Sequence, residues 1–128
     1  MASNGLLVQR TAVFESVLIG NAVTTHSSGI YIPAGAIITG IRVVSPGAQT
    51  NQTAASATIQ LRVGTDSLMS TARLSQVGAQ TIPVALTLNQ AGGVYVPNSG
   101  ELNLIVQASS NSSYVGTLDF YVDYFFVQ

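Results

Sequence analysis

The C-terminal segment Thr117–Gln128 alternates strictly between two sets of side chains. The set on one face is entirely apolar or aromatic and consists of Leu118, Phe120, Val122, Tyr124 and Phe126. Alternation with a period of two indicates a β-strand that turns one face toward a hydrophobic core. Because the pattern runs to the last residues, we expect the C-terminal end to be held in the core. The sequence therefore predicts a β fold whose core includes this strand.

The same alternation recurs along the chain. Residues 58–63 and 101–107 have the pattern of half-buried strands, and residues 37–44 and 84–89 that of two more apolar ones. Residues 7–14, 16–19 and 22–26 are rich in β-branched and apolar side chains and predict two or three further strands. Turn-forming runs of Pro, Gly, Asn and Ser separate these segments. Short strands at this spacing predict an all-β protein, an antiparallel β-sandwich of jelly-roll or Greek-key type with about eight strands and little or no helix.

One segment, residues 67–77, is compatible with two structures. Leu68 and Ala72 are four residues apart, as in a short helix that Asp66 would cap. An irregular strand fits equally well, and the neighbouring strands favour it. We therefore expect an irregular strand here and keep the helix as the alternative.

A sequence pattern that ends one strand and begins the next occurs twice. Tyr31–Ile38 reads Tyr-Ile-Pro-Ala-Gly-Ala-Ile-Ile, and Tyr95–Leu102 reads Tyr-Val-Pro-Asn-Ser-Gly-Glu-Leu. In each, proline removes a ladder donor and ends an extended piece, and glycine permits the turn that follows. The repetition predicts the same corner in each half of a two-sheet sandwich, with chance similarity of a common turn as the alternative.

The chain carries unusually few charges for a soluble domain. Asp, Glu, Lys and Arg make up 7% of its 128 residues, with a net charge of −1, whereas an average domain contains about 25%. We interpret the sparse charge as a surface that other subunits cover. The alternative is a secreted β domain coated with Ser, Thr, Asn and Gln. The length predicts a single domain over residues 1–128.

Composition also argues against several partners. The four basic residues are all arginine and are dispersed, as Arg10, Arg42, Arg62 and Arg73. Nucleic acid is not an expected partner, because phosphate binding needs clustered positive charge. No membrane partner is expected either, since the apolar runs fall far short of the ~20 residues of a membrane helix. The absence of cysteine excludes disulfides and thiolate metal sites.

The search for reactive groups finds no assembled site. His26, the sole histidine, lies among hydroxyl residues without a Gly-x-Ser-x-Gly elbow, which favours a hydrogen-bonded surface residue over a general base. Asp119 and Asp123 share one face of the last strand but lie roughly 13 Å apart by the rise of a strand, too far for a glycosidase pair. Phosphate-binding glycine patterns are missing. The sequence predicts no catalytic, cofactor or metal site and no enzyme.

Aromatic residues carry the remaining functional signal. We expect Tyr31 and Tyr95 to fill the two corners with their hydroxyls at the rim, the alternative being a platform that stacks sugars. Tyr114 lies in a predicted loop and is a candidate binding residue. Tyr121 and Phe125 lie opposite the core face of the last strand and predict a second apolar surface, covered by another element or by a neighbouring subunit.

Three segments carry a resemblance to a known class of protein. The corner Pro33–Arg42, the strand Ala57–Asp66 and the closing strand Leu118–Tyr124 resemble the small β-sandwich structural proteins of tailed bacteriophages, and most of all head decoration or cement proteins. The resemblance covers about residues 30 to 128, and it carries no catalytic residue over. It implies a jelly-roll homotrimer on the exterior of the virion capsid, made in the host cytoplasm, that bridges capsomers by binding the major capsid protein.

Residues 1–10 precede the resemblance and are interpreted as an N-terminal arm. The candidate contacts with a neighbouring subunit or the capsid are Leu6, Leu7, Val8, Arg10, Tyr121 and Phe125. Two other functions stay open at this point. A carbohydrate- or receptor-binding module would use the loops around Asn51, Asn89 and Tyr114, and a tail or neck component of the virion would share the fold and the composition.

Overall fold

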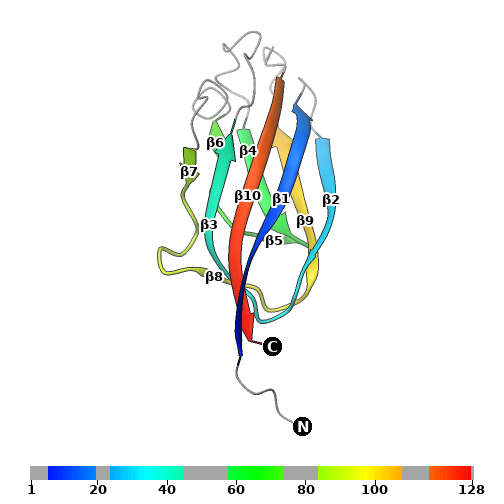
Figure 1. The fold of residues 1–128 in the computed structure, drawn as a ribbon. Helices are drawn as coiled ribbons and strands as arrows, with labels where there is room; N and C mark the ends of the chain where they lie inside the picture. The colour runs from blue at the N-terminus through cyan, green and yellow to red at the C-terminus, as the bar shows by residue number, and fades with distance from the viewer. Residues whose placement is uncertain (1–5, 20–23, 45–57, 74–83, 108–115, 128) are drawn as a thin grey trace.

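The computed structural model describes residues 6–19, 24–44, 58–73, 84–107 and 116–127. They form two five-stranded antiparallel sheets that face one another (Figure 1). Sheet A has the order β1-β10-β3-β7, with β8 also paired to β3, and sheet B has the order β2-β9-β4-β5, with β6 also paired to β4. The strands are β1 (Leu7–Ile19), β2 (Thr24–Ile32), β3 (Ile37–Val44), β4 (Thr58–Val63), β5 (Asp66–Ser67), β6 (Ala72–Arg73), β7 (Val84–Leu86), β8 (Val94–Tyr95), β9 (Gly100–Gln107) and β10 (Gly116–Val127).

The strand order is that of a jelly roll. The short strands β5 and β6 pair with opposite ends of β4, and β7 and β8 pair with opposite ends of β3. The ten segments therefore occupy eight strand positions. In sheet A, β10 lies between β1 and β3, and in sheet B, β9 lies between β2 and β4, so each sheet interleaves strands from both halves of the chain. The predicted all-β sandwich of jelly-roll type is confirmed.

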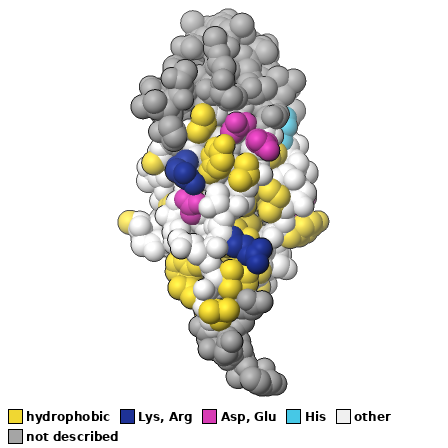
Figure 2. Space-filling model, viewed as in Figure 1, with side chains coloured by type: hydrophobic (Ala, Val, Ile, Leu, Met, Phe, Trp, Pro, Cys, Tyr) yellow, Lys and Arg dark blue, Asp and Glu magenta, His cyan; other side chains and the backbone are white. Residues whose placement is uncertain are grey.

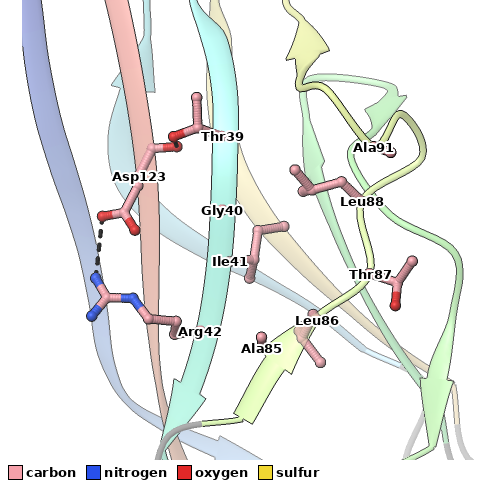
Figure 3. A pocket seen from close by; sticks show the side chains of 10 residues that line it. All are labelled: Thr39, Gly40, Ile41, Arg42, Ala85, Leu86, Thr87, Leu88, Ala91 and Asp123. Atoms are coloured by element: carbon pink, nitrogen blue, oxygen red, sulfur yellow. Dashed lines mark hydrogen bonds and ion pairs between the residues drawn. The ribbon is translucent and has the colours of Figure 1, made fainter.

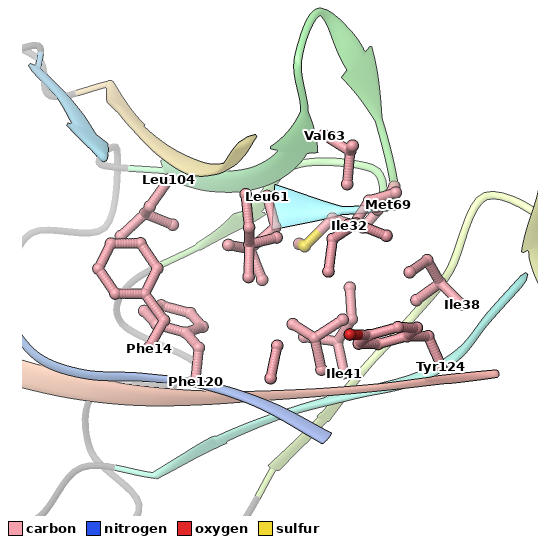
Figure 4. Close-up of a cluster of buried hydrophobic side chains, with 14 of the residues drawn as sticks. Phe14, Ile32, Ile38, Ile41, Leu61, Val63, Met69, Leu104, Phe120 and Tyr124 are labelled. Atoms are coloured by element: carbon pink, nitrogen blue, oxygen red, sulfur yellow. The ribbon is translucent and has the colours of Figure 1, made fainter. Parts of the chain in front are cut away.

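The hydrophobic core lies between the two sheets (Figure 4). On β10 the side chains of Leu118, Phe120 and Val122 are fully buried, as the alternation predicts. Phe120 packs against Phe14 of β1 with ring centroids 6.3 Å apart. Each fully buried side chain of this size contributes about 1.5–3 kcal/mol to folding through the area removed from water. The closing strand is thus a central element of the core.

The N-terminal strands differ in extent from the prediction. Residues 7–19 form one continuous strand, β1, whose pairing with β10 shifts register between Phe14 and Val17. A bulge at this point explains why the alternation in the sequence breaks there. Residues 7–10 pair with residues 124–127 of β10, so the predicted arm is corrected: these four residues belong to sheet A, because the ladder to β10 extends to Leu7. Residues 1–5 lie outside the described residues.

The ambiguous segment is extended through residue 73. The Leu68 amide donates to the Leu61 carbonyl at 3.0 Å, and the Leu68 carbonyl accepts from the Asn89 amide at 3.0 Å. Met69 forms a bridge to Leu88. Because these backbone groups are bonded to other strands, they cannot form helical bonds, and the irregular strand is confirmed for residues 67–73. Residues 74–77 lie outside the described part of the chain.

The repeated pattern builds two crossings between the sheets. One corner leads from β2 in sheet B to β3 in sheet A, and the other leads from β8 in sheet A to β9 in sheet B. The corners bond to each other, since the Gly35 amide donates to the Val96 carbonyl at 2.7 Å and the Val96 amide donates to the Ala36 carbonyl at 2.8 Å. The prediction of one corner used twice is confirmed.

The tyrosines of the two corners do not fill them. Tyr31 is 69% exposed and Tyr95 is 61% exposed. The next residue in each copy, Ile32 or Val96, is buried instead. Since adjacent residues of a strand point to opposite faces, burial of the aliphatic residue directs the tyrosine outward. The expected role of the tyrosines as corner plugs was therefore wrong.

Candidate interaction surface

The outward face of sheet A is the candidate site. Tyr121 and Phe125 lie on it, half-buried, on the side of β10 opposite the core. Directly paired residues of antiparallel strands share a face, so the registers of β1, β10, β3, β7 and β8 define rows of side chains across the sheet. The predicted second apolar surface is thus present, and the register identifies its other members.

Five apolar side chains form what we call the apolar patch, near the end of the sandwich at which β1 begins. One row joins Phe125 of β10 to Ile37 of β3 and Tyr95 of β8. The next row pairs Leu7 with Val127, which are 58% and 60% exposed. Figure 2 shows hydrophobic side chains gathered at this end of the molecule. This exposed apolar area makes the patch the candidate interaction surface of the described residues.

A polar row crosses the middle of the same face. The Thr11 hydroxyl donates to Asp123 Oδ1 at 2.6 Å, and Arg42 Nη2 lies 3.1 Å from the same oxygen. The Arg42 guanidinium also lies over the Tyr121 ring, 5.4 Å from its centroid. Because both ions are partly solvated, the pair contributes at most about 1 kcal/mol to stability. The main effect of the Arg42–Asp123 pair is that each charge is neutralised by a partner in the same chain.

A hollow of about 350 Å³ opens beside this polar row, between β3 and the segment that joins β7 to β8 (Figure 3). It exists because β7 leaves β3 after Leu86 and β8 rejoins β3 only at Val94. The residues that line it are Thr39, Gly40, Ile41, Arg42, Ala85, Leu86, Thr87, Leu88, Ala91 and Asp123. The lining is mainly apolar, with one paired arginine and aspartate at its rim.

The outward face of sheet B has a different character. On β4, Arg62 Nε donates to Gln60 Oε1 at 2.8 Å, and Gln60 Nε2 donates to the Met69 carbonyl at 3.0 Å. On β9, Glu101 Oε2 accepts a hydrogen bond from the Gly29 amide at 2.8 Å. Polar side chains alternate outward along β2, β4 and β9. Among the described positions, Tyr31 and Ile105 are apolar exceptions. The two faces of the sandwich are therefore unequal.

The structure separates the predicted contact residues into two groups. Leu7, Tyr121 and Phe125 lie on the outward face of sheet A, whereas Val8 and Arg10 pair with residues of β10 that face the core side. The Arg10 guanidinium lies 5.8 Å from the centroid of the Phe126 ring. Leu6 precedes β1 and is 54% exposed. Tyr114 and Asn51 lie outside the described residues.

Sequence reasoning missed Val13, Ile37 and Tyr95 as members of the outward face. Each lies on a strand other than β10, and only the registers place them in rows with Tyr121 or Phe125. Tyr31 and Tyr95 lie on opposite faces of the sandwich, since Tyr31 pairs with Glu101 in sheet B and Tyr95 pairs with Ile37 in sheet A. The two tyrosines therefore do not form one stacking platform.

Among the residues that the structure describes, no three His, Cys, Asp or Glu side chains lie close enough to hold a metal ion. Asp119 and Asp123 share the outward face of β10, as predicted. None of the described segments is a helix with the length and hydrophobicity needed to cross a membrane.

Comparison with known proteins finds the same fold in two phage capsids. No protein-family model and no curated protein matches the sequence. A chain of the acid-stable capsid of Helicobacter pylori bacteriophage KHP30 superposes with a TM-score of 0.53 at 12% identity, covering 94% of each chain. A chain of the cyanophage Pam1 capsid asymmetric unit superposes with a TM-score of 0.50 at 21% identity, covering 97% of this chain and 86% of that one. Both are capsid chains. At these identities the likeness shows a shared fold.

Proposed function

We propose that this protein is a structural component of a phage virion, and specifically a decoration or cement protein that binds the outer surface of the head as a homotrimer. The observation that carries the proposal is the difference in polarity between the two outward faces of the sandwich. One face carries an apolar patch beside charges that are already paired, and the other is polar. The fold shared with two phage capsid chains and the sparse charge of the whole chain support the same conclusion.

In this proposal the apolar patch is the surface that contacts the major capsid protein. Leu6 immediately precedes β1, next to Leu7 of the patch, and adds exposed apolar area at this end of the sandwich. Binding across the junction of two capsomers removes apolar area of both from water, so separating the capsomers requires re-exposing that area. The protein thereby stabilises the head without any chemical step.

Substituting Tyr95 by glutamate tests the patch directly. We expect Tyr95→Glu to weaken binding to capsids that lack the protein by about 30-fold, because a carboxylate without a partner would be buried at an apolar contact. Tyr31→Glu is the matched control, since Tyr31 occupies the equivalent position of the repeated corner, has similar exposure and lies on the opposite face. Binding is measured by co-sedimentation over a range of protein concentrations, with thermal unfolding as a check on the fold.

Equal binding by the two variants would show that the patch is not part of the capsid contact. Failure of the wild-type protein to sediment with capsids would contradict the decoration function as a whole. Co-sedimentation with purified tails in place of heads would then favour a tail or neck component. Binding to a glycan array by the wild type would favour the carbohydrate-binding module.

A further inference from the structure

We propose that copies of the chain associate head-to-tail, with Val13 of one copy seated in the hollow beside β3 of the next. This inference rests on the proposed homotrimer and names the contact that would close its ring. Val13 lies on the outward face of β1 and is 39% exposed. The hollow opens at the edge of the same sheet, beside β3 and β7, and the outward residues Arg42, Ala85 and Asp123 are part of its lining.

The position of the two features in sheet A favours a ring. The order β1-β10-β3-β7 places Val13 on one edge of the sheet and the hollow at the other. A contact between two different surfaces of the same chain repeats from copy to copy, and it closes when the rotation between copies divides a full turn. Features on opposite edges are compatible with such a ring, because each copy then uses a different edge for each of its two neighbours.

The register places the two features at the same level along the strands. One row runs from Val13 through Tyr121 and Arg42 to Ala85, which lines the hollow. Rotation about an axis parallel to the strands moves no atom along that axis, so a side chain enters a neighbour's hollow only if it lies at the hollow's level. Val13 meets this condition. Leu7, the other large exposed side chain of β1, lies at the end of the sheet and does not.

The chemistry of the hollow suits an aliphatic side chain. Leu86, Leu88 and Ala91 supply apolar walls, and the Arg42–Asp123 pair at the rim needs no further counter-ion. The pairing of Arg42 with Asp123 leaves no unpaired charge at the rim to oppose the entry of an apolar side chain.

Two single substitutions test the contact from its two sides. We expect Val13→Glu and Ala85→Glu each to raise the concentration at which the oligomer dissociates by at least about tenfold, because each places a carboxylate in the apolar contact. Thr25→Glu is the control, since Thr25 is an exposed β-branched residue on β2, the edge strand of sheet B. Mass in solution is measured by sedimentation equilibrium without capsids, and the wild type should weigh about three times the chain mass of 13.3 kDa.

An equimolar mixture of the two variants provides the sharper test. Val13→Glu retains an intact hollow and Ala85→Glu retains an intact Val13, so the mixture should form one good contact per pair and stop at one-to-one dimers. A wild-type monomer, or variants that keep the wild-type mass, would overturn the contact. If Val13→Glu fails to fold, Ala85→Glu decides alone. A trimer that does not bind capsids would contradict the proposed function and leave this contact intact. A monomer that binds capsids would contradict the contact and the homotrimer but leave the capsid binding intact.

Discussion

Replacing Phe120 by alanine should lower the free energy of unfolding by about 4 kcal/mol, the usual cost of deleting a fully buried phenylalanine. Phe120 has no exposed surface and packs against Phe14 across the pairing of β1 and β10. A domain of this kind has a total stability of about 5–15 kcal/mol, so the variant should be close to its folding limit. Urea unfolding followed by circular dichroism measures the effect, since the chain contains no tryptophan.

Phe125→Ala is the control for this prediction. It removes the same side chain from the same strand, but from the outward, half-buried position. Because less area is lost from the core, we expect a cost of at most about 1.5 kcal/mol. Equal losses for the two variants, measured at the same protein concentration, would show that the inward and outward faces of β10 are wrongly assigned.

Gly93→Ala should destabilise the fold by about 3 kcal/mol, whereas Gly92→Ala should change stability little. Gly93 has a φ of +127°, and a Cβ there would lie 2.7 Å from Ile37 Cγ2 and 3.2 Å from the Ile38 carbonyl oxygen. Strained backbone and overpacking each cost about 1–3 kcal/mol. At Gly92 an added Cβ meets nothing within 4 Å.

The glycine pair tests how the chain returns to β3 after the hollow. Gly93 immediately precedes β8, and its amide donates to the Gln90 carbonyl at 3.1 Å. Thermal unfolding of both variants measures the difference. A Gly93→Ala protein as stable as wild type would mean that the turn adopts another backbone conformation, and the shape of the hollow would then need revision.

The two outward faces of the sandwich divide polar and apolar exposure between them. On the polar outward face of sheet B, the side chains of Gln60, Arg62 and Glu101 are hydrogen-bonded within the sheet. Apolar exposure is concentrated on sheet A and at one end of the sandwich. A concentrated apolar surface binds one kind of partner, whereas the same area scattered as single residues binds none in particular.

The local pattern of residues was sufficient to predict most of the strands, the jelly-roll class and the repeated corner. Each depends on properties of near neighbours: period-two alternation, as in Leu118 to Phe126, and the Pro and Gly that end one strand and allow the next to begin. The inward and outward faces of β10 follow from the same pattern. These features survive in any arrangement of the strands, because the backbone of a strand dictates which way each side chain points.

Only the tertiary structure decided which outward residues share a surface. Val13, Tyr121, Arg42 and Ala85 come from four strands far apart in the sequence, and the registers of three separate pairings bring them into one row. The outward orientation of Tyr31 and Tyr95 likewise depends on the burial of the next residue at each corner, Ile32 or Val96. The physical reason is that register is set by long-range contacts: a slip of one residue would move every side chain of a strand to the other face, and no local pattern records which residue of a partner strand lies opposite.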